Sequence, residues 1–244
     1  MATKTASSWY SPRVDHHINL VRWGHYGQPV LLFPTAGGDA EEVERMHMIG
    51  ALAPLIDAGR IKVYSIDSIA GRALAAKWGS EEHRCWLLNG FEEFIAHEVV
   101  PAIRNDCHSD EIEVIAAGAS IGAFKATAVT CRYPWAFKAA IGMSGTYDLE
   151  TLLGFRGVGD FYFASPLAFV PNLDGPLLDK LRSRFILMAY GQGRWENPDE
   201  AWRLGGVLGA KGVPNRIDPW GPEWDHDWPT WRKMLPLYLD ELTR

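Results

Sequence analysis

The sequence lacks long apolar runs and has little cysteine. None of its 244 residues form a run close to the about 18 apolar residues that a membrane-spanning helix needs. The first residues also lack the apolar centre of a secretory signal, so we expect no membrane span and a cytoplasmic location. Cys85, Cys107 and Cys131 are odd in number and have no metal-type spacing. They predict free thiols rather than a disulfide framework.

Excess positive charge is absent as well. Lys and Arg together number 24, Asp and Glu 30, and the formal net charge is −6. This balance argues against nucleic acid as a partner. The chain is 47% hydrophobic and 22% charged, without internal repeats or low-complexity segments. We therefore expect one globular domain over residues 1–244.

A serine motif follows one of the apolar runs. Residues 112–117 predict a strand, residues 118–122 read Gly-Ala-Ser-Ile-Gly, and residues 123–131 suit a helix. In this strand–turn–helix context, G-x-S-x-G is typical of a serine nucleophile, here Ser120. Gly118 and Gly122 permit the tight turn, and the start of the helix favours negative charge. The alternative is an ordinary turn in which Ser120 caps a helix.

Strands and helices alternate along the rest of the chain. The expected strands are 9–23 (one strand or a pair), 29–33, 61–67, 112–117, 137–143, 184–190 and 215–220. The expected helices are 40–57, 81–104 with a kink near Val100 caused by Pro101, 123–131, 199–209 and 230–242. Alternation predicts an α/β-hydrolase type of α/β fold, a mostly parallel central sheet with helices on both faces. Residues 149–180 suggest either a loop-rich excursion over the active site or a satellite of the core.

A nucleophilic serine needs a base, which is nearly always histidine. Of the eight histidines, His226 follows the last predicted strand, at the sheet edge where parallel α/β sheets bind ligands. Its neighbours Asp225 and Asp227 resemble metal ligands, but no second ligand cluster accompanies them. We therefore predict His226 as the base, and neither a metal nor an organic cofactor.

The imidazole in turn needs a carboxylate to orient it. Glu196 is the first candidate because it follows the strand expected over 184–190 and precedes His226. Asp199 is the second and also suits a helix cap, and Asp148 is the third. Glu196 also fits a solvated loop carboxylate.

Two backbone amides are expected to bind the oxyanion. One is the amide of Ile121, directly after the serine, and the other comes from the loop after an earlier strand. That loop is the glycine-rich stretch 34–39, in which the Ala36 or Gly37 amide is the candidate. The alternative is a plain helix-entry loop with Asp39 as its cap.

These motifs together resemble the putative esterase family of α/β-hydrolases, which includes esterase D type enzymes and mycolyltransferases. The resemblance depends on residues 118–122, on the loop 34–39 and above all on residues 226–231, His-Asp-Trp-Pro-Thr-Trp. A similar H-x-W-x-x-W stretch carries the family's catalytic histidine. The resemblance runs from about Trp23 to the C-terminus and implies Ser120 as nucleophile, His226 as base and an acid at Glu196. The loop 34–39 departs from the His-Gly form common in esterases, and Ala123 replaces a second glycine.

The sequence thus predicts a serine hydrolase that cleaves small-molecule carboxylic esters through an acyl-enzyme. One alternative is acyl transfer to an alcohol, because aromatic residues at 155–169 could exclude water. Another is a catalytically silent binding protein with a hydrolase-like fold. The sequence specifies neither the acyl nor the alcohol part of the substrate.

Overall fold

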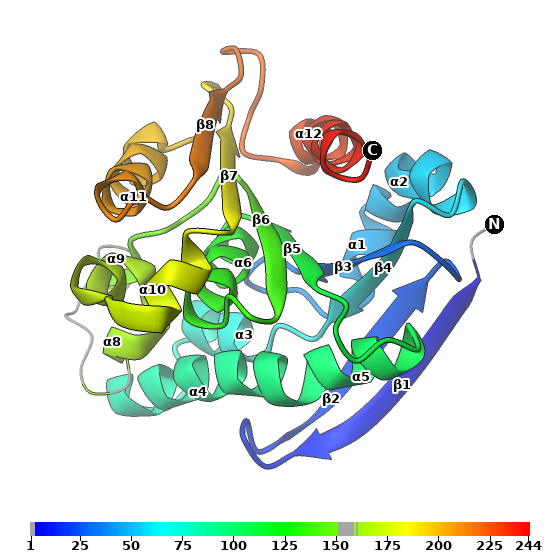
Figure 1. The fold of residues 1–244 in the computed structure, drawn as a ribbon, viewed down its shortest axis with the longest axis horizontal. Helices are drawn as coiled ribbons and strands as arrows, with labels where there is room; N and C mark the ends of the chain where they lie inside the picture. Colours follow the sequence, from blue (N-terminus) through cyan, green and yellow to red (C-terminus); the bar gives the residue numbers. More distant parts are fainter. Residues whose placement is uncertain (1–2, 151–158, 160) are drawn as a thin grey trace.

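The computed structural model describes residues 3–150, 159 and 161–244, which are built around one eight-stranded sheet (Figure 1). The strands are β1 (Lys4–Ser11), β2 (His16–Trp23), β3 (Gln28–Phe33), β4 (Ile61–Ile66), β5 (Val114–Ala119), β6 (Phe137–Met143), β7 (Phe185–Tyr190) and β8 (Asn215–Pro219). Their order is β1-β2-β4-β3-β5-β6-β7-β8. β1 and β2 form an antiparallel hairpin, β2 is antiparallel to β4, and the remaining neighbours are parallel. The predicted, mostly parallel sheet is confirmed.

Helices cover both faces of this sheet. On one face lie α1 (Glu42–Arg45), α2 (Met48–Asp57) and α12 (Trp228–Leu242), and α12 packs directly against α2 (Figure 1). On the other lie α3 (Ile69–Ala76), α4 (Glu81–Phe94), α5 (Val100–Asp106), α6 (Ile121–Arg132) and α11 (Pro198–Ala210). Two layers of helix therefore remove the central strands from water, as continuously apolar strands require.

Strand β3 shows how the two cores are divided. Val30 and Leu32 pack into the cluster under α2 and α12, whereas Leu31 and Phe33 pack against α4 and α6. Successive side chains of a strand point to opposite faces, so a run of apolar residues serves both layers.

The structure corrects one helical prediction, refines a second and adds one helix. The helix expected over 40–57 is interrupted at His47, whose left-handed φ of 62° separates α1 from α2. The helix expected over 81–104 contains a π-helical turn, Ile95–Val99, between α4 and α5. This wider turn precedes Pro101, which has no N–H to donate. The irregularity expected near Val100 is therefore present as a π-helical turn, and the helix continues through it. Helix α3 is not among the expected helices.

The described part of 149–180 is largely helical. It contains α8 (Phe161–Ala164), α9 (Pro166–Phe169), a 3₁₀ turn (Val170–Asn172) and α10 (Gly175–Leu181). Apolar residues of α8 join the core beneath α4, and those of α9 and α10 join the core beneath α11. These residues pack as part of the core, and Phe155 of the expected aromatic cover lies outside the described residues.

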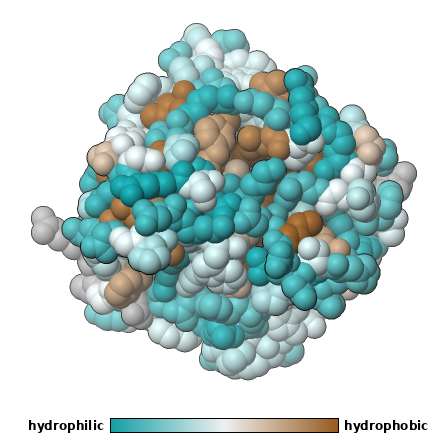
Figure 2. All heavy atoms as spheres, viewed as in Figure 1, coloured by the Kyte–Doolittle hydropathy of each residue, from teal (hydrophilic) through white to brown (hydrophobic). Residues whose placement is uncertain are grey.

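The surface is largely polar on the face shown in Figure 2, with apolar residues in small separate patches. Among the described residues, no helix has the length and apolar character to cross a membrane. Cys85, Cys107 and Cys131 are free thiols, which agrees with the cysteine prediction.

We expect that shortening a buried side chain of the central strand β3 lowers the stability of the fold. Leu31 is fully buried, so Leu31→Ala should lower the free energy of unfolding by about 2–5 kcal/mol through lost burial and a residual cavity. Leu177→Ala on α10 is the matched control, because Leu177 is 37% exposed and its truncation should change stability by less than about 0.5 kcal/mol. Urea unfolding measures both, and equal losses would contradict this division of core and surface.

Candidate active site

Ser120 lies in the tight turn between β5 and α6. Its backbone adopts φ 56° and ψ −125°, a conformation that residues other than glycine rarely occupy. A Cβ on Gly118 would lie 2.4 Å from the backbone carbonyl of Gly122, and a Cβ on Gly122 would lie 2.5 Å from the carbonyl oxygen of Phe33. Both positions therefore require glycine, and the strain at Ser120 marks this turn as a candidate functional site.

The turn stands beside the loop that follows β3. β3 and β5 are parallel neighbours, with Phe33 opposite Gly118. The chain leaves β3 toward α1 and α2 on one face, but from β5 it enters α6 on the other face. Open α/β sheets form a ligand-binding crevice at such a point of divergence. The predicted nucleophile and the predicted oxyanion loop both lie at this point of divergence.

The amides expected to bind an oxyanion are unengaged. Within the described part of the chain, the N–H groups of Ile121, Ala36 and Gly37 donate to no other protein atom. The next amide, that of Gly38, donates to the carbonyl of Thr35 at 3.1 Å and closes a turn. Ile121 also opens α6, where the helix dipole favours an anion.

The loop after β3 is held from below by a carboxylate. Glu42 accepts hydrogen bonds from the Thr35 N–H at 2.8 Å and from the Thr35 hydroxyl at 2.7 Å. The loop also leads into α1, but the expected cap at Asp39 is wrong: Glu41 is the N-cap residue, its side chain makes no capping hydrogen bond, and Asp39 accepts the Glu41 N–H at 2.9 Å within the preceding turn.

Glu196 lies beside His226, with 4.0 Å between Glu196 Oε2 and His226 Nδ1. Only 2% of the Glu196 side chain and 21% of the His226 side chain are exposed. Burial raises the pKa of Glu196, against hydrogen bonds from Ser144 and Gly191. Burial lowers the pKa of His226, against the negative charge of Asp227. At neutral pH the imidazole is therefore uncharged, the state that a general base needs.

Ser144 and Trp231 hold the Glu196 carboxylate in place. The Ser144 hydroxyl donates to Glu196 Oε1 at 2.6 Å and accepts from Trp231 Nε1 at 2.9 Å. The Trp231 ring also meets the His226 ring edge-on, with centroids 5.3 Å apart. The sequence analysis missed Ser144, although a serine directly after a buried strand was a signal, and it assigned Trp231 no role of its own.

The loops that carry Glu196 and His226 are joined along their backbones. The His226 N–H donates to the Arg194 carbonyl at 3.0 Å, and the Gly193 N–H donates to the Trp224 carbonyl at 3.0 Å. A Cβ on Gly191 would lie 1.9 Å from the Trp224 carbonyl oxygen, so the approach depends on glycine. This contact fixes the candidate acid relative to the candidate base.

The aspartates beside His226 have structural partners. Asp225 accepts hydrogen bonds from the Arg194 backbone and guanidinium at 2.7–2.9 Å. Asp227 accepts from the Trp228 N–H at 2.7 Å and caps α12. In the part of the chain that is described, no group of three or more His, Cys, Asp or Glu side chains is arranged to hold a metal ion.

The other two candidate acids lie elsewhere. Asp199 is exposed in the first turn of α11, and Asp148 forms an ion pair with Arg203. Glu200, which the sequence analysis did not consider, accepts the N–H groups of Tyr147 and Asp148 and so shapes the loop after β6. Of the three candidates, the structure brings Glu196 together with His226.

The serine and the imidazole are not joined directly. Among the described residues, the Ser120 hydroxyl has no hydrogen-bond partner. Trp228, Gly118 and Ala119 line one small apolar pocket of about 10 Å³, which places the start of α12 against the strand that leads to Ser120. Without substrate, hydrogen bonds between catalytic groups are often long and tighten only when substrate binds.

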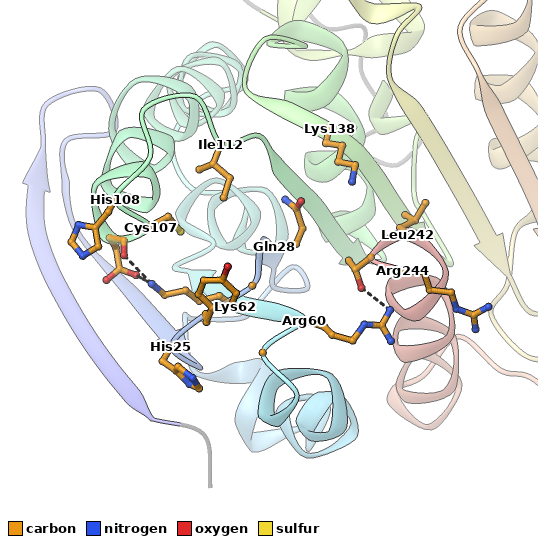
Figure 3. A pocket seen from close by; sticks show the side chains of 15 residues that line it. His25, Gln28, Arg60, Lys62, Cys107, His108, Ile112, Lys138, Leu242 and Arg244 are labelled. Atoms are coloured by element: carbon orange, nitrogen blue, oxygen red, sulfur yellow. Dashed lines mark hydrogen bonds and ion pairs between the residues drawn. The ribbon is translucent and has the colours of Figure 1, made fainter.

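A hollow of about 660 Å³ lies at the opposite edge of the sheet (Figure 3). It is bordered by Gln28 at the start of β3 and by Lys62 near the start of β4. It is therefore separated from the crevice by the length of a six-residue strand, roughly 20 Å. Two of its cations have partners, since Lys62 pairs with Asp106 and Arg60 donates to Thr243. The hollow does not belong to the candidate active site.

Solved structures with the same overall architecture span the whole chain. A ferulic acid esterase has a TM-score of 0.77 and 17% identity, with coverage of 100% of this chain and 98% of its own. The S-formylglutathione hydrolase of Staphylococcus aureus has a TM-score of 0.71 and 15% identity, with full coverage of both chains. MPT51 of Mycobacterium tuberculosis has a TM-score of 0.74 and 15% identity, with coverage of 100% of this chain and 98% of its own. At these identities the likeness shows the fold alone. No curated protein sequence matches the chain.

The strand order, the turn at Ser120 and the loop at His226 define a protein of the α/β-hydrolase fold. The family model described as "Putative esterase" matches residues 42–240, which is most of the chain. The chain therefore belongs to this esterase family, as the sequence resemblance predicted. Membership supports ester hydrolysis as the general activity.

The Ser144 contacts predict a pH-dependent loss of stability. Ser144→Ala removes one hydrogen bond from buried Glu196 and leaves Trp231 Nε1 without its acceptor, which should cost about 1–3 kcal/mol of unfolding free energy. The loss should grow as pH rises, because the pKa of Glu196, already raised by burial, rises further and ionising the folded protein becomes harder.

Urea unfolding at pH 5 and pH 8 measures this effect. Ser183→Ala is the matched control, because the Ser183 hydroxyl is exposed and donates only to the nearby Lys180 carbonyl. A loss for Ser144→Ala that is equal at the two pH values would show that Ser144 does not act through the Glu196 carboxylate.

Proposed function

We propose that this protein hydrolyses carboxylic esters through an acyl-enzyme formed on Ser120. The observation that carries the proposal is the strained backbone of Ser120, which sits at the start of α6 and at the crevice beside the loop after β3. A strained serine at a helix N-terminus is the arrangement that nucleophile turns of this fold use.

Each proposed step has a group suited to it. His226 accepts the Ser120 proton as the hydroxyl oxygen attacks the acyl carbon, and it then donates that proton to the leaving alcohol. Glu196 holds the imidazole in one tautomer and stabilises its cation. A water molecule, activated by His226 in the same way, releases the acid and restores Ser120.

The charge that develops on the acyl oxygen needs preorganised donors. The Ile121 amide and the amide of Ala36 or Gly37 supply them, since none of the three is engaged within the described residues. The names of two similar structures, a ferulic acid esterase and an S-formylglutathione hydrolase, denote cleavage of an ester and of a thioester. Activated esters of small acyl groups are therefore suitable first substrates.

A fluorophosphonate probe tests the nucleophile directly. Intact-mass analysis should show one adduct on the wild-type protein and none on Ser120→Ala. Ester hydrolysis by Ser120→Ala or His226→Ala should fall by about 10⁴-fold or more, because the triad acts as a unit.

The acid is tested by matched amide substitutions. Glu196→Gln should label slowly, whereas Asp199→Asn and Asp148→Asn should label at the wild-type rate, because neither aspartate is placed beside His226. Labelling of Glu196→Gln at the wild-type rate would show that another acid orients His226. No adduct on folded wild-type protein would instead favour a silent binding protein, and ester formed with an added alcohol would indicate acyl transfer.

The pH profile tests the base. Because burial lowers the pKa of His226 below its usual 6.5 and the neutral ring is the active form, the acid-side decline of kcat/KM should lie below that pH. Asp227→Asn removes a charge that raises this pKa but keeps a side chain able to cap α12, so the decline should move to still lower pH. A decline at the same pH as in the wild type, or at a higher pH, would contradict His226 as the titrating base.

A further inference from the structure

Lys125 is completely buried in α6, five positions after Ser120. A lysine in a helix normally directs its ammonium group to water, and a fully buried one needs specific partners. The proposed reaction does not use this side chain, so its position calls for an explanation.

The ammonium group lies beneath the loop after β3. Lys125 Nζ donates a hydrogen bond to the hydroxyl of Ser68, and it lies 4.7 Å from the centre of the Phe91 ring. A Cβ built on Gly71 would meet the Ser68 hydroxyl, Lys125 Nζ and the Ala36 carbonyl oxygen, each within 3.0 Å. Lys125 therefore borders the same small space as the backbone of a candidate oxyanion residue.

Ser68 extends this contact to the loop itself. Its N–H donates to the carbonyl of Gly38 at 3.2 Å, and its own carbonyl accepts the N–H of Arg72 in α3. Ser68 is fully buried, so water does not compete for these bonds. A chain of contacts thus runs from α6 through Lys125 and Ser68 to Gly38, next to the amides of Ala36 and Gly37.

Charged groups from three further helices surround the ammonium. Glu42 of α1 and Glu92 of α4 favour its charge, whereas burial, the largest effect, and Arg72 of α3 oppose it. The pKa of Lys125 is consequently lowered to about 7. Glu42 is also the carboxylate that holds Thr35, so the ammonium helps to balance the charge beneath the loop.

Stability alone does not account for this lysine. Removing an ammonium group from water costs free energy, and an apolar side chain of similar volume is often as stabilising or more so. Natural proteins tolerate such costs mainly where the group serves the active site.

We propose that Lys125 is a positioning residue, which fixes the candidate oxyanion loop relative to α6 through Ser68. The two halves of the oxyanion site come from these two elements, Ile121 from α6 and Ala36 or Gly37 from the loop. Their spacing must match one oxygen atom, and the chain from Lys125 to Gly38 joins them. This inference rests on the proposed function.

The test compares Lys125→Met, Ser68→Ala and their double variant in ester hydrolysis. Each single change should lower kcat by about 10- to 100-fold, as a misplacement of about 1 Å does, while KM changes by less than about threefold. Because both residues act through one contact, the double variant should be little worse than the worse single variant. The unfolding free energy of Lys125→Met should be unchanged or higher.

The pH profile separates positioning from general packing. Wild-type kcat should decline as pH rises through about 7, where Lys125 loses its charge, and on to about 8, where the buried carboxyl of Glu92 gains one; Lys125→Met should lack the step near 7. Thr130→Val on the same helix is the matched control. Thr130 is also fully buried, but its hydroxyl donates only to the Ala126 carbonyl of its own helix, so kcat and its alkaline decline should persist.

Each outcome decides the proposal. Wild-type kcat in Lys125→Met and Ser68→Ala would overturn it and leave the proposed hydrolysis standing. A wild-type protein without esterase activity or fluorophosphonate labelling would overturn both. If Lys125→Met does not fold, Ser68→Ala alone decides, because it keeps the lysine and removes only its acceptor.

Discussion

The close packing of α6 against β3 is the constraint on which the crevice depends. Gly122 leaves no room for a side chain beside the Phe33 carbonyl, and Gly118 leaves none beside Gly122. Because the helix starts so near the sheet, the chain must turn sharply, and Ser120 takes a strained conformation with a positive φ. The same approach brings the loop after β3 alongside the start of α6. One steric requirement therefore shapes both the candidate nucleophile and the candidate oxyanion site.

The candidate acid depends on a second, polar constraint. A carboxylate with 2% of its side chain exposed is costly unless its oxygens are hydrogen-bonded, and Ser144 and Gly191 meet that need. Trp231 orients Ser144 and also borders the ring of His226. The H-x-W-x-x-W stretch thus combines a histidine with the tryptophan that organises its surroundings, which gives a physical reason for the spacing.

The sequence predicted the features that local pattern controls. β6 begins and ends where it was expected, and the turn at Ser120 follows from its two glycines. The break at His47 was missed, because a left-handed histidine has no local signal. Ser144 and Lys125 were missed for another reason. Their partners lie 52 and 57 positions away, so only the folded chain shows what they bind.

The two buried charges beside the crevice are perturbed in ways that suit different tasks. Burial raises the pKa of Glu196 and lowers that of Lys125, so each is harder to ionise than in water. Glu196 nevertheless lies beside an imidazole, whose positive charge during the reaction would favour the carboxylate. No charge that forms only during the reaction is proposed beside Lys125. Glu42 and Glu92, which belong to the folded protein itself, favour its charge instead. This difference suits a reacting pair at Glu196 and His226 and a fixed support at Lys125.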